Sequence, residues 1–170
     1  MDAVAFVNSL RTLMPSAVDL EEYGLDAEEI ADVQSAFDAK QRQTYEAKNT
    51  EVEHLVTAFD CSSIAIGIVR FDSGVTSVKG GTRFAYCEAD PLVVDGDGRI
   101  LMLHHDVIDA DPIGCAEDSE RFLDAMLFAA DAIVNRVGWK GRGIEVAREC
   151  SERAGGSGYL GFYRSVVGGL

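Results

Sequence analysis

The sequence predicts an α+β fold: an antiparallel sheet in the middle of the chain, with helices before and after it packed on the sheet. Apolar residues recur at helical spacing in the first sixty residues and again after residue 116, whereas short apolar runs separated by turn residues fill the segment 63–105. Helical and strand patterns do not alternate along the chain, as they would in a parallel sheet. A mixed sheet is the alternative.

Length and composition predict one domain. The chain has 170 residues, of which 47% are apolar, and we expect a single domain over 1–170. It should contain N-terminal helices over 1–48, a helix and sheet core over 49–105, and C-terminal helices with a tail over 106–170. The N-terminus lacks the features of a signal peptide, and no run approaches the about 20 apolar residues that span a bilayer. We therefore expect no membrane partner.

The cysteines indicate a reducing compartment. They lie far apart without CxxC spacing, at Cys61, Cys87, Cys115 and Cys150. This distribution is typical of buried, reduced thiols rather than of a zinc site or a disulfide framework. We therefore expect a cytoplasmic protein.

Two amphipathic helices are expected in the first forty residues. The first has an apolar stripe and ends before Pro15. The second follows Asp26, a residue type that commonly caps the N-terminus of a helix. The polar stretch 38–49 either prolongs the second helix or forms a solvated link. A short helix then follows Thr50, which has the spacing of a capping box with Glu53.

The strands are expected next. The run SSIAIGIVRF (62–71) is apolar on both faces, which predicts a central strand. TRFAYCEA (82–89) and DPLVVD (90–95) predict two further short strands or one bent strand. The DGDG segment marks a turn, and RILMLHH (99–105) predicts the return strand of a hairpin.

The C-terminal part is expected to be helical. A strong amphipathic pattern from Glu117 to Val137 predicts a helix capped by Asp118 or Ser119 and stopped by Gly138. A second helix should cover 144–153 and end at the glycine pair that follows it, after which an apolar tail packs on the core.

The segment around DGDG also invites a metal interpretation. Asp95, Asp97 and Asp106 match positions one, three and twelve of a calcium loop, but Arg99 and Ile100 occupy the fifth and sixth positions, where a ligand and glycine are needed. A hairpin turn is therefore favoured over a calcium site.

The histidines offer only a weak alternative. His104 and His105 are adjacent, so in a strand they point to opposite faces and do not bind one ion together. A metal-dependent enzyme using His54, His104 and Asp106 remains the less favoured alternative to hydrogen-bonded strand-end residues. The sequence also has no serine elbow or phosphate loop, so we expect no enzyme activity, no cofactor and no bound metal.

The charge distribution indicates the kind of partner. The formal net charge is −14, which opposes direct binding of nucleic acid and favours a basic protein partner. Acids concentrate in 19–38, which contains no base, and in 88–124, whereas 136–164 is net positive. The candidate partner-binding residues lie on the approach to the long C-terminal helix, and they are Asp106, Asp109, Asp111, Glu117 and Asp118.

Three blocks of the sequence resemble a known family. NTEVEHLVTAFDCSSIAIGIVRF resembles the SUKH superfamily pattern of an Asn-led helix, an aromatic-Asp-Cys-Ser turn and a strand with a glycine. DPLVVDGDGRILMLHHD is similar to the family's paired strands with an acidic turn, and SERFLDAML is similar to the helix that follows. The likeness covers about residues 49 to 130 in the family's order. The first helices lack the usual Leu-Pro and Asn-Gly signals, and the tail after Val137 has no counterpart.

The resemblance implies an α+β domain that is often an immunity protein, which binds and neutralises a cognate toxin, frequently a nuclease, in competition between bacteria. Other members are scaffolds or regulators of cell-wall assembly. We therefore expect a non-catalytic protein-binding domain that docks on a basic toxin through its acidic surface. A regulatory or scaffold module is the alternative, and the oligomeric state stays open.

Overall fold

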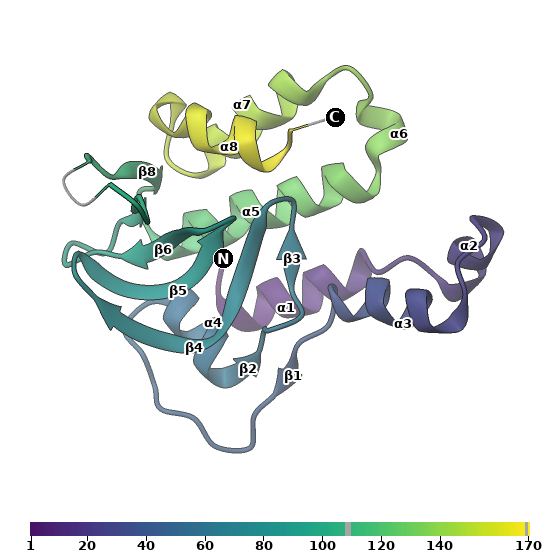
Figure 1. Ribbon diagram of the computed structural model, residues 1–170, viewed down its shortest axis with the longest axis horizontal. Coiled ribbons are helices and arrows are strands. Elements are labelled where there is room, and N and C mark those ends of the chain that lie inside the picture. Colours follow the sequence, from purple (N-terminus) through teal and green to yellow (C-terminus); the bar gives the residue numbers. More distant parts are fainter. Residues whose placement is uncertain (108–109, 169) are drawn as a thin grey trace.

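A six-stranded antiparallel sheet forms the middle of the chain, and helices precede and follow it (Figure 1). The computed structural model describes residues 1–107, 110–168 and 170. The strands pair in chain order and curl around the helices, and they are β3 (Ala65–Ile66), β4 (Val69–Val78), β5 (Gly81–Cys87), β6 (Asp90–Val94), β7 (Ile100–Met102) and β8 (Ile113–Ala116). The predicted α+β class is confirmed, and the sheet is antiparallel rather than mixed.

The N-terminal region contains three helices where two were predicted. They are α1 (Ala3–Thr12), α2 (Ala17–Glu22) and α3 (Ala27–Ser35). Asp26 caps α3 in a full capping box with Glu29, which confirms the predicted cap. The helix that the prediction missed, α2, buries no residue and begins where the Ser16 hydroxyl accepts a hydrogen bond from the Asp19 N–H. It has no apolar stripe long enough to predict it.

The predicted capping box at Thr50 is wrong, although α4 (Glu51–Ala58) begins where expected. The Thr50 hydroxyl donates to the Glu53 carboxylate instead of accepting from the backbone. The Glu51 N–H donates to the Ser119 hydroxyl at 3.0 Å, so a residue distant in sequence caps this helix. The polar stretch before α4 does not prolong α3, because it contains β1 (Lys40–Gln41), which pairs with β2 (Phe59–Asp60).

The prediction of one central strand over 62–71 is also wrong. The chain reverses at Gly67, whose φ is 58°, so the run divides into the edge strand β3 and the start of the long strand β4. Ile64 and Ile66 are buried in the core, where β3 contacts α5 (Ser119–Val134), whereas Ala65 on the other face of β3 is exposed. The other expected strands are confirmed as β5, β6 and β7.

The C-terminal helices follow the prediction with one exception. α5 begins after Asp118, whose carboxylate accepts from the Arg121 N–H at 2.8 Å, as expected of an N-cap. α5 ends at Val134, and Gly138 does not stop it but lies inside α6 (Arg136–Trp139). The later elements, which include the predicted packed tail, are α7 (Gly143–Arg153), the 3-10 helix η1 (Ser157–Tyr159) and α8 (Leu160–Val166).

One hydrophobic cluster connects the helices to the sheet. α1, α4 and α5 contact one another and α4 and α5 contact the sheet, while α7 packs on α5 and α8 packs on α7. The four cysteines are buried and free, which confirms the prediction, and burial raises the pKa of Cys61 and Cys150 to about 12. No helix in the described part of the chain is long and apolar enough to cross a membrane.

Candidate protein-binding surface

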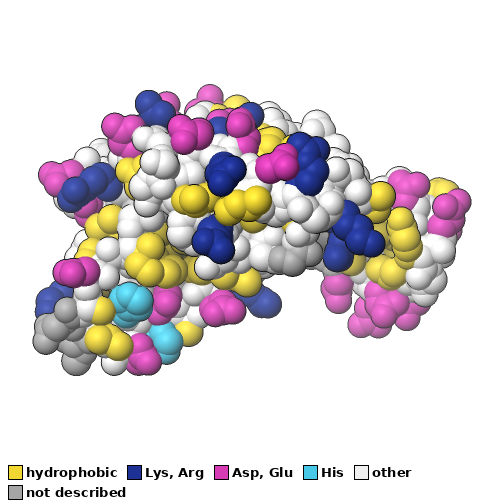
Figure 2. All heavy atoms as spheres, turned by 90° about the horizontal axis from the view of Figure 1, so that it is seen from above, with side chains coloured by type: hydrophobic (Ala, Val, Ile, Leu, Met, Phe, Trp, Pro, Cys, Tyr) yellow, Lys and Arg dark blue, Asp and Glu magenta, His cyan; other side chains and the backbone are white. Residues whose placement is uncertain are grey.

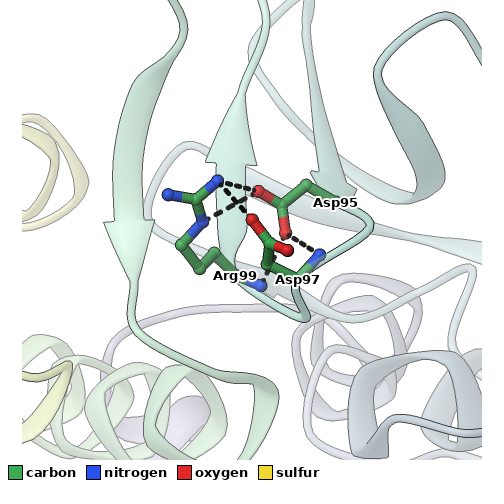
Figure 3. A network of polar contacts seen from close by, with 3 residues as sticks. All are labelled: Asp95, Asp97 and Arg99. Atoms are coloured by element: carbon green, nitrogen blue, oxygen red, sulfur yellow. Dashed lines mark hydrogen bonds and ion pairs between the residues drawn. The ribbon is translucent and has the colours of Figure 1, made fainter.

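Asp95, Asp97 and Arg99 form a network of hydrogen bonds and ion pairs in the turn between β6 and β7 (Figure 3). Asp95 Oδ1 accepts from the N–H groups of Asp97 and Arg99, both at 2.9 Å, and Asp95 Oδ2 accepts from Arg99 Nε at 2.9 Å. Burial alone would raise the pKa of Asp95, but the hydrogen bonds from Arg99 and Asp97 hold it below its usual value. The Asp95 oxygens therefore hold the turn together, and the antiparallel pairing of β6 with β7 confirms the predicted hairpin.

We expect Asp95→Ala to lower the free energy of unfolding by about 1–2 kcal/mol, because two turn N–H groups and Arg99 lose their acceptor. Urea-induced unfolding measures the loss. Asp97→Ala is the matched control, since its exposed carboxylate makes only an ion pair with Arg99 and is worth about 0–1 kcal/mol. Equal losses in the two variants would contradict this account of the turn.

The loop that follows β7 is tied to the sheet at its base. His105 donates its N–H to Asp90 Oδ1 at 2.9 Å, and His105 Nδ1 lies 2.7 Å from the same oxygen. Leu103 N–H donates to Pro91 O. The hydrogen bond with Asp90, and the charge of Asp106, raise the pKa of His105, and burial opposes this only in part. Although burial alone would raise it, the pKa of Asp90 is lowered by the bonds from His105.

The contact between His105 and Asp90 predicts how the stability of the protein depends on pH. The pKa of His105 is raised, so its contribution is present below the ordinary histidine value of about 6.5 and is lost as pH rises through the folded-state pKa. The pKa of Asp90 is lowered, so its contribution is present above about 3.9 and is lost as pH falls through the folded-state pKa. We expect His105→Gln to destabilise the protein more at about pH 5.5 than at about pH 8.5. In an Asp90→Asn background this difference should shrink to the part that the charge of Asp106 causes, and an undiminished difference would contradict the pairing.

The structure separates the five predicted partner-binding residues into two groups. Asp106 and Asp111 are exposed on the loop between β7 and β8, and neither makes an ion pair with a described residue. Asp109 lies outside the described residues. Glu117 and Asp118 both lie near Arg121, at 3.3 and 3.4 Å from its Nε, and Asp118 also caps α5.

Glu117 has a further structural role. Its N–H donates to Ala154 O at 2.8 Å, which connects the end of β8 to the end of α7. A methyl group on Gly155 would lie 2.8 Å from Glu117 Cβ, so the two segments are in close contact. Among the candidates that the structure describes, the carboxylates without an ion pair are therefore those of Asp106 and Asp111.

Two apolar residues lie beside these acids. Val107 is 53% exposed and Ile113, at the start of β8, is also exposed. The sequence analysis did not single them out, but their signal was visible as apolar residues inside the acidic segment HHDVIDADPIG. Exposed apolar side chains with polar residues at their rim are typical of protein interaction sites. We define the loop surface as Asp106, Val107, Asp111 and Ile113.

The histidines show no metal-binding arrangement in the part of the chain that the structure describes, where no three His, Cys, Asp or Glu side chains form a suitable group. His54 lies on α4 and stacks edge-on against Tyr45, with ring centroids 5.4 Å apart. His104 and Asp106 follow β7, so the proposed trio of His54, His104 and Asp106 does not converge.

Comparison with known proteins found no match: no family model, no curated protein and no solved structure matches the chain. The observations that bear on function are therefore the α+β fold, the net charge and the loop surface.

Proposed function

We propose that this chain is a non-catalytic protein-binding domain that neutralises a basic toxin, in the manner of an immunity protein, by docking through the loop surface. The observation that carries the proposal is that Asp106 and Asp111, which make no ion pair with a described residue, lie on the same loop as the exposed Val107 and Ile113. The likeness of three sequence blocks to the SUKH superfamily favours the same class of protein. A nuclease is the proposed toxin.

Inhibition of the toxin by this mechanism requires only that its active-site groove is blocked, and no catalytic step. A nuclease presents a cationic groove to its substrate, so carboxylates that occupy the phosphate positions block the groove. The net charge of −14 accelerates encounter with a basic partner at low salt. Burial of Val107 and Ile113 then contributes a stabilising term that salt does not screen.

The partner can be identified in the native host. The tagged protein is purified at low salt, and the proteins released at high salt are quantified by mass spectrometry. One near-stoichiometric basic protein, with a toxic activity that the complex blocks, supports the proposal. A constitutive cellular complex instead supports a scaffold, and bound metal without a protein supports an enzyme.

Charge reversal tests the loop surface itself. We expect the double variant Asp106→Lys/Asp111→Lys to slow association with the toxin by about tenfold or more at low salt, because steering is lost, while the fold is retained. Stopped-flow binding measures the rate, and each single reversal is compared with Glu152→Lys, an equal charge change at an exposed position on α7. If Glu152→Lys slows association as much as either single loop variant, the effect comes from the net charge of the protein, and the toxin does not dock on the loop surface.

A further inference from the structure

We propose that two copies of this chain associate by placing the acidic arm of each copy in a basic hollow of the other. The acidic arm is the segment 16–35, which contains α2 and α3. The basic hollow is formed by α6, α7, α8 and the described residues Gly168 and Leu170. The inference does not rest on the proposed function, because the loop surface takes no part in it.

The acidic arm carries charge that the rest of its own copy does not neutralise. It contains seven acids and no base, and these are Asp19, Glu21, Glu22, Asp26, Glu28, Glu29 and Asp32. None of the seven makes an ion pair with another residue that the structure describes, whereas the next acid, Asp38, pairs with Arg11 at 2.6 Å. The arm, which projects from the body (Figure 1), therefore carries negative charge that no described residue neutralises by an ion pair.

The acidic arm also has apolar side chains without a place in the core. Tyr23 is 81% exposed, Val18 is exposed, and Ile30 is the only buried residue of the two helices. A helix of six residues such as α2 is marginal in water unless packing supports it. Within the chain α2 contacts mainly α3. The exposed apolar residues are thus suited to cover by another surface.

The basic hollow has the complementary chemistry. Three adjoining cavities of about 390, 230 and 140 Å³ surround Leu170 and the end of α8. Arg136, Lys140 and Arg164 line them, and none of these bases pairs with a carboxylate in the described ranges. Val137, at the rim, is 86% exposed. Unpaired cations around apolar side chains match the unpaired acids and apolar residues of the acidic arm.

The positions of the two surfaces favour a second copy as the occupant. Figure 1 places α2 and α6 at the same end of the molecule, yet neither helix of the arm has extensive contact with α6, α7 or α8 of its own copy. Seen from above, Lys and Arg side chains lie on the body beside the projecting acidic arm (Figure 2). A two-fold axis at this end makes both arm-to-hollow contacts at once, as in an isologous dimer.

The first experiment is sedimentation velocity of the full chain. We expect a dimer at about 150 mM salt, where the long-range repulsion between two copies of net charge −14 is largely screened, and dissociation at about 500 mM, where the contacting charge pairs are weakened as well. A chain that stays monomeric at about 150 mM salt across micromolar to millimolar concentrations overturns the proposal.

Two charge-reversed variants make the test specific. We expect the arm variant Glu21→Lys/Glu22→Lys/Glu28→Lys and the hollow variant Arg136→Glu/Lys140→Glu each to raise the dimer dissociation constant at least tenfold. In an equimolar mixture, the reversed arm of one variant meets the reversed hollow of the other, and the remaining contact is unaltered, so a heterodimer should form. Circular dichroism of each variant verifies folding, and a correctly folded pair that remains monomeric when mixed overturns the proposed contact.

Discussion

Replacing Phe122 by alanine is expected to lower the free energy of unfolding by about 3–5 kcal/mol, the range for a large cavity in a packed core. Phe122 is fully buried on α5. Its ring meets Phe84 of β5 edge-on at 5.5 Å and lies 6.3 Å from Phe162 of α8. The substitution therefore removes the ring that connects the sheet, the long helix and the C-terminal tail. Domains of ordinary stability have only about 5–15 kcal/mol in total.

Urea-induced unfolding, followed by circular dichroism and by the fluorescence of the single tryptophan, Trp139, measures this loss. Phe122→Leu keeps most of the volume and should cost about 1–2 kcal/mol. Val4→Ala on the exposed side of α1 should change stability by less than about 0.5 kcal/mol. A loss for Phe122→Ala no larger than that for Phe122→Leu would show that the surrounding rings close the cavity.

The elements that the sequence predicted correctly are those with a complete local signal. Asp26 and Glu29 carry both halves of the α3 cap, and Asp118 lies directly before the long apolar stripe of α5. The DGDG turn was likewise predictable, because Asp95 bonds only to residues within its own turn. In each case the interacting groups lie within four residues of one another, so spacing is sufficient.

The errors occur where a distant residue determines the local structure. Thr50 has the capping-box spacing, but Ser119 reaches the free N–H of Glu51 and makes the local cap unnecessary. The strand β8 was not predicted, because its four residues are mostly small and follow an acidic loop; pairing with β7 defines it. Such contacts are formed by the tertiary fold and have no signal in nearby residues.

The candidate surface was predictable in part. The exposure of Asp106 and Asp111 was expected, because the acidic segment was predicted to be a solvated loop that enters the long C-terminal helix. The pairing of Glu117 with Arg121 has helical i to i+4 spacing, a signal that was present but not used. The contact of Glu117 with Gly155 was not predictable, because it depends on how α7 ends beside β8.

Gly67 is the position where the second large effect is expected. Its φ of 58° lies in the left-handed region, which costs a residue with a Cβ roughly 1–2 kcal/mol. A methyl group there would also overlap the carbonyl oxygen of Val166 at the end of α8. Overpacking against a backbone group adds about 1–3 kcal/mol, because a carbonyl in a helix does not rotate away as a flexible side chain does. We therefore expect Gly67→Ala to destabilise the protein by about 2–5 kcal/mol.

A second glycine separates the two causes. Gly24 also has a positive φ, of 84°, but a methyl group there meets nothing within 4 Å. In urea-induced unfolding, Gly24→Ala should therefore show only the conformational cost of about 1–2 kcal/mol, and the excess loss for Gly67→Ala reports the contact with α8. Equal losses would mean that α8 moves away from the turn without cost. An excess loss would show that the turn after β3 packs so closely on the end of α8 that a side chain at position 67 is not accommodated.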